Sequence, residues 1–253
     1  MKTGFMTALL ISTLCISAQS ADEYRLFLST KKKPATITTS AEDVIVWVNN
    51  NPIEIVHHAM DSVSLLLNPW IRKGTNSVHL TGLSERELEM NVVKNPSEKS
   101  CGSLKVLLKD KRKSEQLIFN VNEEVKSLLS NTSAITNKTS LPDDARAFLA
   151  DINKIIEARD YKKFMKLMEE RVKFQSSLYE LDYASMLPEA EAYWKENIGN
   201  VEPIDIDALS YVIGESSILL YRKSEERAYF LTIGNNKAPP IVIVKMNGKW
   251  IMW

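Results

Sequence analysis

The chain has 253 residues, 44% of them hydrophobic, which is enough to bury one large core or two smaller ones. Lys and Arg together number 32 and match the 32 Asp and Glu residues, so the chain has no net charge that would attract nucleic acid or an anionic membrane surface. We therefore expect no nucleic-acid partner.

Residues 1–20 have the pattern of a secretory signal peptide. Lys2 supplies a positive charge at the start, residues 5–16 form an apolar segment, and Ala-Gln-Ser at 18–20 is a small-x-small cleavage site. We expect cleavage near Ser20 and Ala21 and a secreted protein, located in a bacterial periplasm. No later segment reaches the roughly 20 apolar residues that a membrane helix needs, so the sequence predicts no transmembrane segment.

Residues 21–122 alternate short apolar runs with polar turns, a pattern typical of an all-β sandwich or jelly roll. The segment 65–80 combines an apolar run, a Pro-Trp step, a Gly-x-Asn turn and a short alternating strand. Because Pro69 and Gly74 constrain the backbone on both sides of Trp70, we interpret this Trp as a core anchor. The predicted strands are 24–28, 44–48, 53–56, 77–80, 88–93, 103–109 and 116–121.

The order of an Asn-rich turn at 49–52, an apolar run, Pro-Trp-Ile at 69–71 and Gly-x-Asn at 74–76 resembles the galactose-binding-like jelly rolls that accompany many glycosidases. The resemblance covers residues 44–80. It implies a sandwich fold and permits glycan binding, but it carries no particular binding residue onto this chain.

Residues 123–140 are rich in Ser, Thr and Asn, which predicts a linker between two domains. From Ser140 the apolar period becomes helical. Apolar stripes predict a helix after Pro142, a second helix that starts at Asp160, and a third that starts at Pro188 and stops at Gly199.

After residue 206 the chain returns to β structure, with predicted strands at 217–222, 227–233, 241–246 and 249–253. Asn247-Gly248 between the last two is a strong hairpin signal. Three helices followed by an antiparallel sheet predict an α+β domain over residues 141–253, with the helices on one face of the sheet.

This second half resembles the nuclear-transport-factor-2-like (SnoaL-like) cone fold. The features that carry the resemblance are the helix break at 158–161, the Tyr-Trp pair at 193–194 and the Gly-x-Trp hairpin at 248–250. Members of this fold include isomerases, dehydratases and non-enzymatic binding modules, so the resemblance implies a fold and leaves the function open.

The sequence offers few groups for catalysis or metal binding. The histidines are His57, His58 and His79, and adjacent histidines on a strand point to opposite faces, so we expect no metal site. We also find no phosphate-binding loop and no nucleophile elbow, and we expect no cofactor. With Cys15 removed, only Cys101 remains, which excludes an intramolecular disulfide; we interpret it as a half-buried small residue rather than a reactive thiol.

A pocket in the second half would have aromatic walls and carboxylates as its only acid or base groups. The acids that would serve as a base are Asp205 and Asp207, although acids in a loop are usually solvated. The aromatic residues that would line such a pocket, unless they simply pack in the core, are Tyr161, Tyr193, Trp194, Tyr221, Tyr229 and Trp250.

Three hypotheses follow. The first is a non-catalytic binding or assembly protein, which would meet a protein partner or a second copy through the C-terminal sheet. The second is a small-molecule isomerase or hydrolase with a pocket in the C-terminal domain. The third is glycan binding by the N-terminal sandwich, for which Trp47 and Trp70 are the aromatic side chains to test.

Overall fold

The computed structural model describes residues 22–30, 43–57, 62–82, 87–106, 108, 116–179, 181–223 and 228–253. The predicted signal peptide, His58 and the Lys-rich segments at 31–33 and 109–113 lie outside the described residues. No helix within the described ranges combines the length and the apolar character that crossing a membrane requires.

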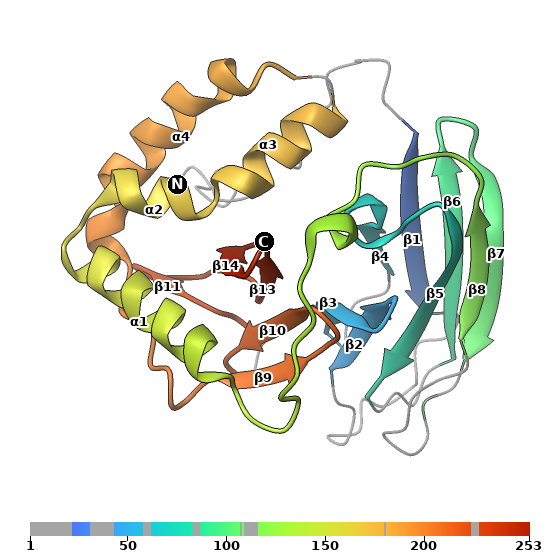
Figure 1. Ribbon diagram of the computed structural model, residues 1–253, viewed down its shortest axis with the longest axis horizontal. Helices are drawn as coiled ribbons and strands as arrows, with labels where there is room; N and C mark the ends of the chain where they lie inside the picture. Colours follow the sequence, from blue (N-terminus) through green and yellow to red (C-terminus); the bar gives the residue numbers. More distant parts are fainter. Residues whose placement is uncertain are drawn as a thin grey trace.

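Two antiparallel four-stranded sheets form the first half of the described chain (Figure 1). Their strand orders are β4-β1-β6-β7 and β3-β2-β5-β8. The strands are β1 (Glu23–Thr30), β2 (Val44–Val48), β3 (Asn51–Val56), β4 (Ser62–Leu66), β5 (Gly74–Thr81), β6 (Leu88–Asn95), β7 (Lys99–Val106) and β8 (Leu117–Val121).

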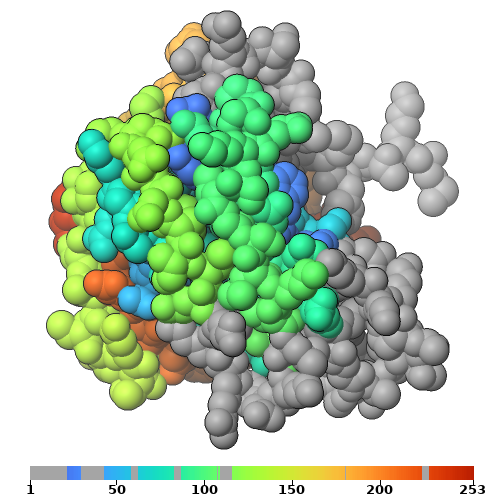
Figure 2. Space-filling view, turned by 90° about the vertical axis from the view of Figure 1, so that its right-hand side faces the viewer, coloured from blue at the N-terminus to red at the C-terminus, as the bar shows by residue number. Residues whose placement is uncertain are grey.

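One apolar core lies between these two sheets. Along β2, Val44, Val46 and Val48 are buried, whereas Ile45 and Trp47 between them are only half-buried, as expected for a strand with one face on a core. At the edge turned away from the helices, β7 and β8 lie side by side on the surface (Figure 2). This arrangement fits the predicted β-sandwich.

The segment 65–80 forms a corner of the first half, as predicted. A short 3-10 helix, η1 (Asn68–Trp70), follows β4, and Gly74 opens β5 with a φ of +95°, which favours glycine. The buried Asn76 side chain closes the turn, because it donates to the carbonyls of Arg72 (2.7 Å) and Gly74 (2.9 Å) and accepts from the Arg72 N–H (2.9 Å).

Helices and a second antiparallel sheet form the other half. The sheet order is β14-β13-β10-β9, and a two-stranded β11-β12 pair stands beside it. The helices are α1 (Asp143–Glu157), α2 (Tyr161–Leu167), α3 (Glu169–Leu178) and α4 (Tyr183–Asn197), with short 3-10 turns η2 (Leu129–Asn131) and η3 (Ile198–Asn200). The strands are β9 (Ser210–Ile213), β10 (Ser217–Tyr221), β11 (Thr232–Ile233), β12 (Asn236–Lys237), β13 (Ile241–Met246) and β14 (Lys249–Met252).

Short sequence motifs correctly predicted where several of these elements begin or end. Asp160 caps α2 by accepting from the Lys163 N–H at 3.1 Å, which confirms the predicted helix break. Asn247 and Gly248 have φ values of 48° and 77°, the conformation of a two-residue hairpin turn, and they join β13 to β14 as predicted.

Three predicted boundaries were wrong. The second helix divides at Met168 into α2 and α3. The third starts at Tyr183 rather than Pro188, because Asp182 caps it by accepting from the Ala184 N–H at 3.0 Å, and Pro188 lies inside it. The predicted strand 227–233 contributes only the short β11 in the described chain, and the fourth strand of the large sheet is β9.

The C-terminal sheet is buried on both faces. Ile218, Leu220 and Ile243 pack in a core with the helices. Their neighbours along β10 and β13, which point the opposite way, belong to the core of the first half; these are Leu219, Val242 and Val244. Strand β3 packs against β10 and β13, so the sheet lies between the helices and the first half (Figure 1).

A buried polar contact joins the two halves. The Asn51 side-chain oxygen, at the start of β3, accepts from the Ser216 N–H (2.9 Å), the Ser216 hydroxyl (3.1 Å) and the Ser217 hydroxyl (3.1 Å). All three residues are buried. Beside them, a Cβ at Gly214 would lie 2.4 Å from Pro52 Cδ and 2.7 Å from the Asn50 carbonyl oxygen, so only glycine fits this close approach.

An aromatic contact joins the halves at a second point. Trp70 is 3% exposed, and its ring meets that of Trp253 edge-on, with centroids 6.3 Å apart. Trp253 also meets Phe174 of α3 edge-on, at 5.0 Å. The burial confirms Trp70 as a core anchor.

We expect Trp70→Ala to lower the free energy of unfolding by about 3–5 kcal/mol, the usual cost of truncating a buried aromatic side chain. Urea denaturation of the full chain measures this loss. The matched control is Phe27→Ala, because Phe27 is 41% exposed, and it should cost less than about 1 kcal/mol. A loss as small for Trp70→Ala as for the control would contradict the burial.

We expect Asn51→Ala to cost about 2–4 kcal/mol, because it leaves the Ser216 N–H and two hydroxyls buried without their acceptor. The same urea denaturation series measures it. Asn120→Ala is the control, since Asn120 accepts from Thr75 on the surface, and it should change the stability by no more than about 0.5 kcal/mol.

Candidate functional site

A cleft of about 510 Å³ lies where the two halves meet, and we call it the junction cleft. Its volume falls in the range of about 300–1,000 Å³ that is usual for small-molecule sites, which often occur between parts of a structure. The residues that line it come from β2, β5, the turns at 49–50 and 213–215 and the segment 134–138; they are Trp47, Asn50, His79, Ala134, Ile135, Lys138, Ile213, Gly214 and Glu215.

A pair of stacked rings forms one wall of the junction cleft. Trp47 and His79 are cross-strand partners on β2 and β5, so their side chains stand on the same face of the sheet. The rings stack with centroids 5.5 Å apart and planes 12° from parallel. The Trp47 indole N–H donates to the Thr81 hydroxyl at 2.8 Å, which fixes the ring orientation.

The opposite wall is held rigidly by backbone contacts. The Glu215 N–H donates to the Asn50 carbonyl (3.0 Å), and the Ile135 N–H donates to the Glu215 carbonyl (2.7 Å). Lys138 and Glu215 are exposed at this wall, so the cleft offers one cationic and one anionic group. A flat aromatic wall with a few polar groups is suited to binding. The charged groups of the cleft are solvated, and the imidazole of His79 is buried and stacked on Trp47.

Polar side chains with unusual surroundings also occur on β3 and on α3. Glu54 of β3 is partly buried, and desolvation raises its pKa to about 7, although the Ile55 N–H and the charge of Arg171 favour the ionised form. Desolvation also lowers the pKa of Arg171, and the Glu54 carboxylate opposes this shift. One turn further along α3, the buried Gln175 Oε1 accepts no hydrogen bond from the described residues.

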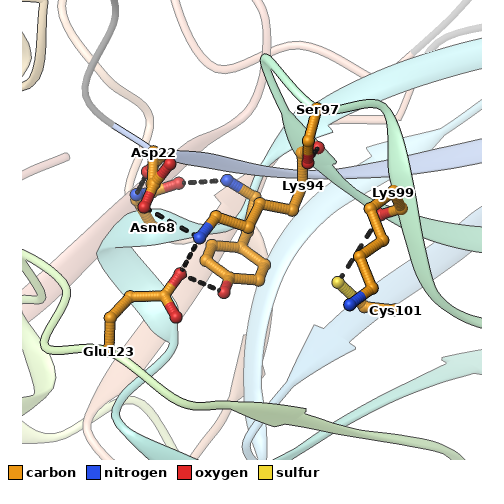
Figure 3. Close-up of polar contacts among 8 residues, drawn as sticks. Asp22, Asn68, Lys94, Ser97, Lys99, Cys101 and Glu123 are labelled. Atoms are coloured by element: carbon orange, nitrogen blue, oxygen red, sulfur yellow. Dashed lines mark hydrogen bonds and ion pairs between the residues drawn. The ribbon is translucent and has the colours of Figure 1, made fainter.

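An ion cluster holds the start of β1 against β6 and the end of β8 (Figure 3). Lys94 Nζ lies 2.8 Å from Asp22 Oδ2 and 2.5 Å from Glu123 Oε1, and the Tyr24 hydroxyl donates to the same Glu123 oxygen at 2.5 Å. The hydrogen bond from Lys94 lowers the pKa of Glu123, and burial followed by the Glu123 carboxylate raises that of Tyr24. All its charges are paired, so the cluster serves to fasten the strands.

Cys101 lies near this cluster, on β7 (Figure 3). Its thiol donates to the Lys99 carbonyl at 3.7 Å, and it is half-buried. Burial raises the pKa of the thiol, which keeps it protonated and poorly nucleophilic. These features support the interpretation of Cys101 as a half-buried small residue rather than a reactive thiol.

The structure places the predicted acids away from the junction cleft. Asp205 and Asp207 are both exposed on the loop before β9. Asp205 accepts from the Ala208 N–H at 3.3 Å, and Asp207 pairs with Arg146 of α1 at 2.7 Å. Neither contact brings them to an aromatic residue that was proposed as a pocket wall.

The predicted aromatic residues separate into two groups, neither of which lines the junction cleft. Tyr161, which donates to Glu191 at 3.1 Å, belongs to the helical group with Tyr193 and Trp194, whose rings are 5.2 Å apart. The remaining residues lie on the sheet and its loops. Lys245 stands over the Trp250 ring at 5.6 Å, Arg222 stands over the Tyr229 ring at 5.6 Å, and Tyr221 ends β10.

The histidines do not come together. His79 lines the junction cleft, while His57 lies 3.9 Å from Asp43 at the other end of β3. No cluster of three or more His, Cys, Asp or Glu suited to a metal ion occurs among the described residues.

Sequence reasoning missed Asn51, Glu54, Arg171 and Gln175. The position of Glu54 was a usable signal, because it interrupts the apolar strand Ile53 to Val56 on the face that Val46 shares. Arg171 and Gln175 gave no signal, since charged and amide residues on a helix are usually solvated.

Comparison of the chain with known protein families, with curated proteins and with solved structures found no match.

We expect Glu54→Gln to become more stabilising, relative to the unchanged protein, as the pH rises. The pKa of the Glu54 carboxyl is about 7 in the folded chain and 4.5 in the unfolded chain. The folded protein therefore has its full stability below pH 4.5 and loses part of it as the pH rises to about 7, because the buried carboxyl must ionise. Gln cannot ionise, so the variant should gain up to about 3 kcal/mol over this window, at roughly 1.4 kcal/mol for each pKa unit.

Urea denaturation at a series of pH values measures this gain. Glu124→Gln is the control, because the Glu124 carboxylate is exposed and pairs with Lys73 at 3.4 Å, and it should show no comparable trend. A Glu54→Gln difference that stays constant with pH would mean that Glu54 is solvated.

Proposed function

We propose that this protein is a secreted, non-catalytic binding protein that holds its ligand in the junction cleft. The observation that carries the proposal is the Trp47–His79 stack in a cleft of small-molecule size between the two halves. The buried Asn51 contact and the close approach at Gly214 keep the walls in place, so little conformational freedom is lost on binding.

A glycan is the ligand class that the chemistry of the cleft favours. An indole offers a broad apolar surface to the C–H face of a sugar ring, and the surrounding groups are both donors and acceptors. Asn50, Lys138 and Glu215 supply these polar groups. This proposal places glycan recognition between the first half and the rest of the chain rather than in the sandwich alone.

The proposal also includes the fold of each half and the location of the protein in the cell. We infer that the first half is a galactose-binding-like jelly roll and the second a nuclear-transport-factor-2-like cone, and that the two share the layer formed by β10 and β13. The signal peptide pattern at 1–20 supports secretion to a bacterial periplasm. Association of two copies through the C-terminal sheet would use an edge strand such as β9, since both faces of β10 and β13 are buried.

The enzyme alternative has less support. An isomerase or hydrolase in the C-terminal half would need an acid inside a pocket, and Asp205 and Asp207 are exposed. Among the described residues, a nucleophile with an adjacent base is not found at the junction cleft.

We expect Trp47→Ala to weaken glycan binding at least tenfold, because it removes the stacking surface. A glycan array identifies the bound oligosaccharide, and isothermal titration with that oligosaccharide measures the change. Phe27→Ala is the matched control: it removes an aromatic side chain that is 41% exposed and does not line the junction cleft, so binding should change by no more than about threefold.

Circular dichroism of both variants checks that they are folded. Full binding by a folded Trp47→Ala variant, or a glycan array without any bound oligosaccharide, would overturn the glycan proposal.

A further inference from the structure

The aromatic wall of the junction cleft is one end of a longer surface. Successive side chains of a strand point to opposite faces, and along β5 those of Val78 and Leu80 enter the core. Thr75, Ser77 and His79 therefore share the outer face of this sheet. Of these three, His79 lines the cleft, while Ser77 is half-buried and Thr75 is exposed. The outer face thus continues from the cleft toward the start of β5.

Strand β8 widens this outer face on the side of β5 away from β2 (Figure 1). Cross-strand partners share a face of the sheet, and Ile118 of β8 is the partner of Ser77. Its side chain is 52% exposed. Asn120 is the partner of Thr75, and its side-chain oxygen accepts from the Thr75 hydroxyl at 3.0 Å. We call these four residues the outer-face strip; they are Thr75, Ser77, Ile118 and Asn120.

The outer-face strip carries no charged side chain. It offers two hydroxyls, one amide and one apolar side chain, and the outward residues of β2 beside it are Ile45 and Trp47. A quarter of the whole chain is charged, and charged residues normally lie on the surface, so an exposed strip without them favours an uncharged ligand. Hydroxyl and amide groups both donate and accept hydrogen bonds, as the hydroxyls of a sugar do.

The length of the surface favours a chain of sugars over a single one. From His79 to Thr75 the strand advances four residues, which is about 14 Å at the usual rise of about 3.4 Å per residue. This distance exceeds the size of one sugar ring. A protein partner is less suited to the strip, because Ile118 stands among polar side chains rather than in a broad apolar patch.

We propose that the junction cleft and the outer-face strip together bind an uncharged linear oligosaccharide, with one sugar ring against Trp47 and the following rings over Ser77 and Ile118. At the far end, the Asn120 amide donates to sugar hydroxyls and the Thr75 hydroxyl oxygen accepts from them. This inference rests on the proposed glycan binding and adds to it the length and the charge of the glycan.

The test is isothermal titration of the full chain with two neutral series, cellobiose to cellohexaose and chitobiose to chitohexaose. We expect one hexasaccharide to bind at least about tenfold more tightly than its own disaccharide, because a disaccharide occupies the cleft alone and makes no contact with the strip. The hexasaccharide of polygalacturonic acid has a comparable length but carries carboxylates. It should bind at least about tenfold more weakly than the neutral hexasaccharide.

Variants separate the strip from the cleft. Ile118→Ser should weaken hexasaccharide binding at least about fivefold and leave disaccharide binding unchanged, because it removes an apolar contact outside the cleft. Trp47→Ala should weaken the binding of both lengths. Phe27→Ala is the matched control, since Phe27 is an exposed apolar residue on the other sheet of the first half, and it should bind both as the unchanged protein does. Circular dichroism checks that each variant is folded.

The outcomes distinguish this inference from the proposed function. Equal binding of disaccharide and hexasaccharide, or full hexasaccharide binding by a folded Ile118→Ser variant, would overturn the extended site and leave glycan binding in the cleft standing. Tighter binding of the acidic hexasaccharide would contradict the uncharged ligand. Absence of binding for every oligosaccharide of the two neutral series would overturn this inference alone, whereas a glycan array without any bound oligosaccharide would overturn both.

Discussion

The buried amide of Asn51 determines how the two halves of this chain meet. It satisfies one backbone N–H and two hydroxyls of Ser216 and Ser217 that have no access to water. An unpaired buried donor costs roughly 1–3 kcal/mol, so the turn at 214–216 is stable in its observed position only while Asn51 is in place. The junction cleft lies beside this turn, and its shape therefore depends on the same contact.

A second consequence concerns the sheet that follows the turn. Because the turn is fixed against the start of β3, strands β10 and β13 lie over the first half, and one of their faces enters its core. The helices cover the other face. The C-terminal sheet is thus a layer that both halves share. Its position determines where α3 and the polar side chains of α3 lie.

Local signals predicted the elements better than their assembly. The Asn-Gly hairpin, the cap at Asp160 and the Gly-x-Asn turn depend on neighbouring residues alone, and the structure confirms each of them. The sequence prediction placed helices on one face of the C-terminal sheet, although the unbroken apolar runs at 218–220 and 241–244 are typical of a sheet buried on both faces. The polar composition of 123–140 pointed instead to a linker, although Leu128 and Ile135 within it are buried.

The candidate sites were harder to predict, for a physical reason. Trp47 was identified as an aromatic side chain to test, but the opposite wall of the cleft includes residues from 134–138 and 213–215, and their proximity to Trp47 depends on the assembly of the halves. Glu54 and Arg171 are far apart in the sequence, and each has an ordinary side chain for its element. Their unusual feature is desolvation, which arises only in the assembled fold.

The contact between Trp70 and Trp253 bears on the order in which the molecule is made. Trp70 is translated long before Trp253, so the first half has an incomplete core while the remainder is still being synthesised. Contacts between such distant residues also slow folding, since a long loop must close before they form. The nascent first half therefore exposes apolar surface until the rest of the chain has been made, and it is most prone to aggregate during this interval.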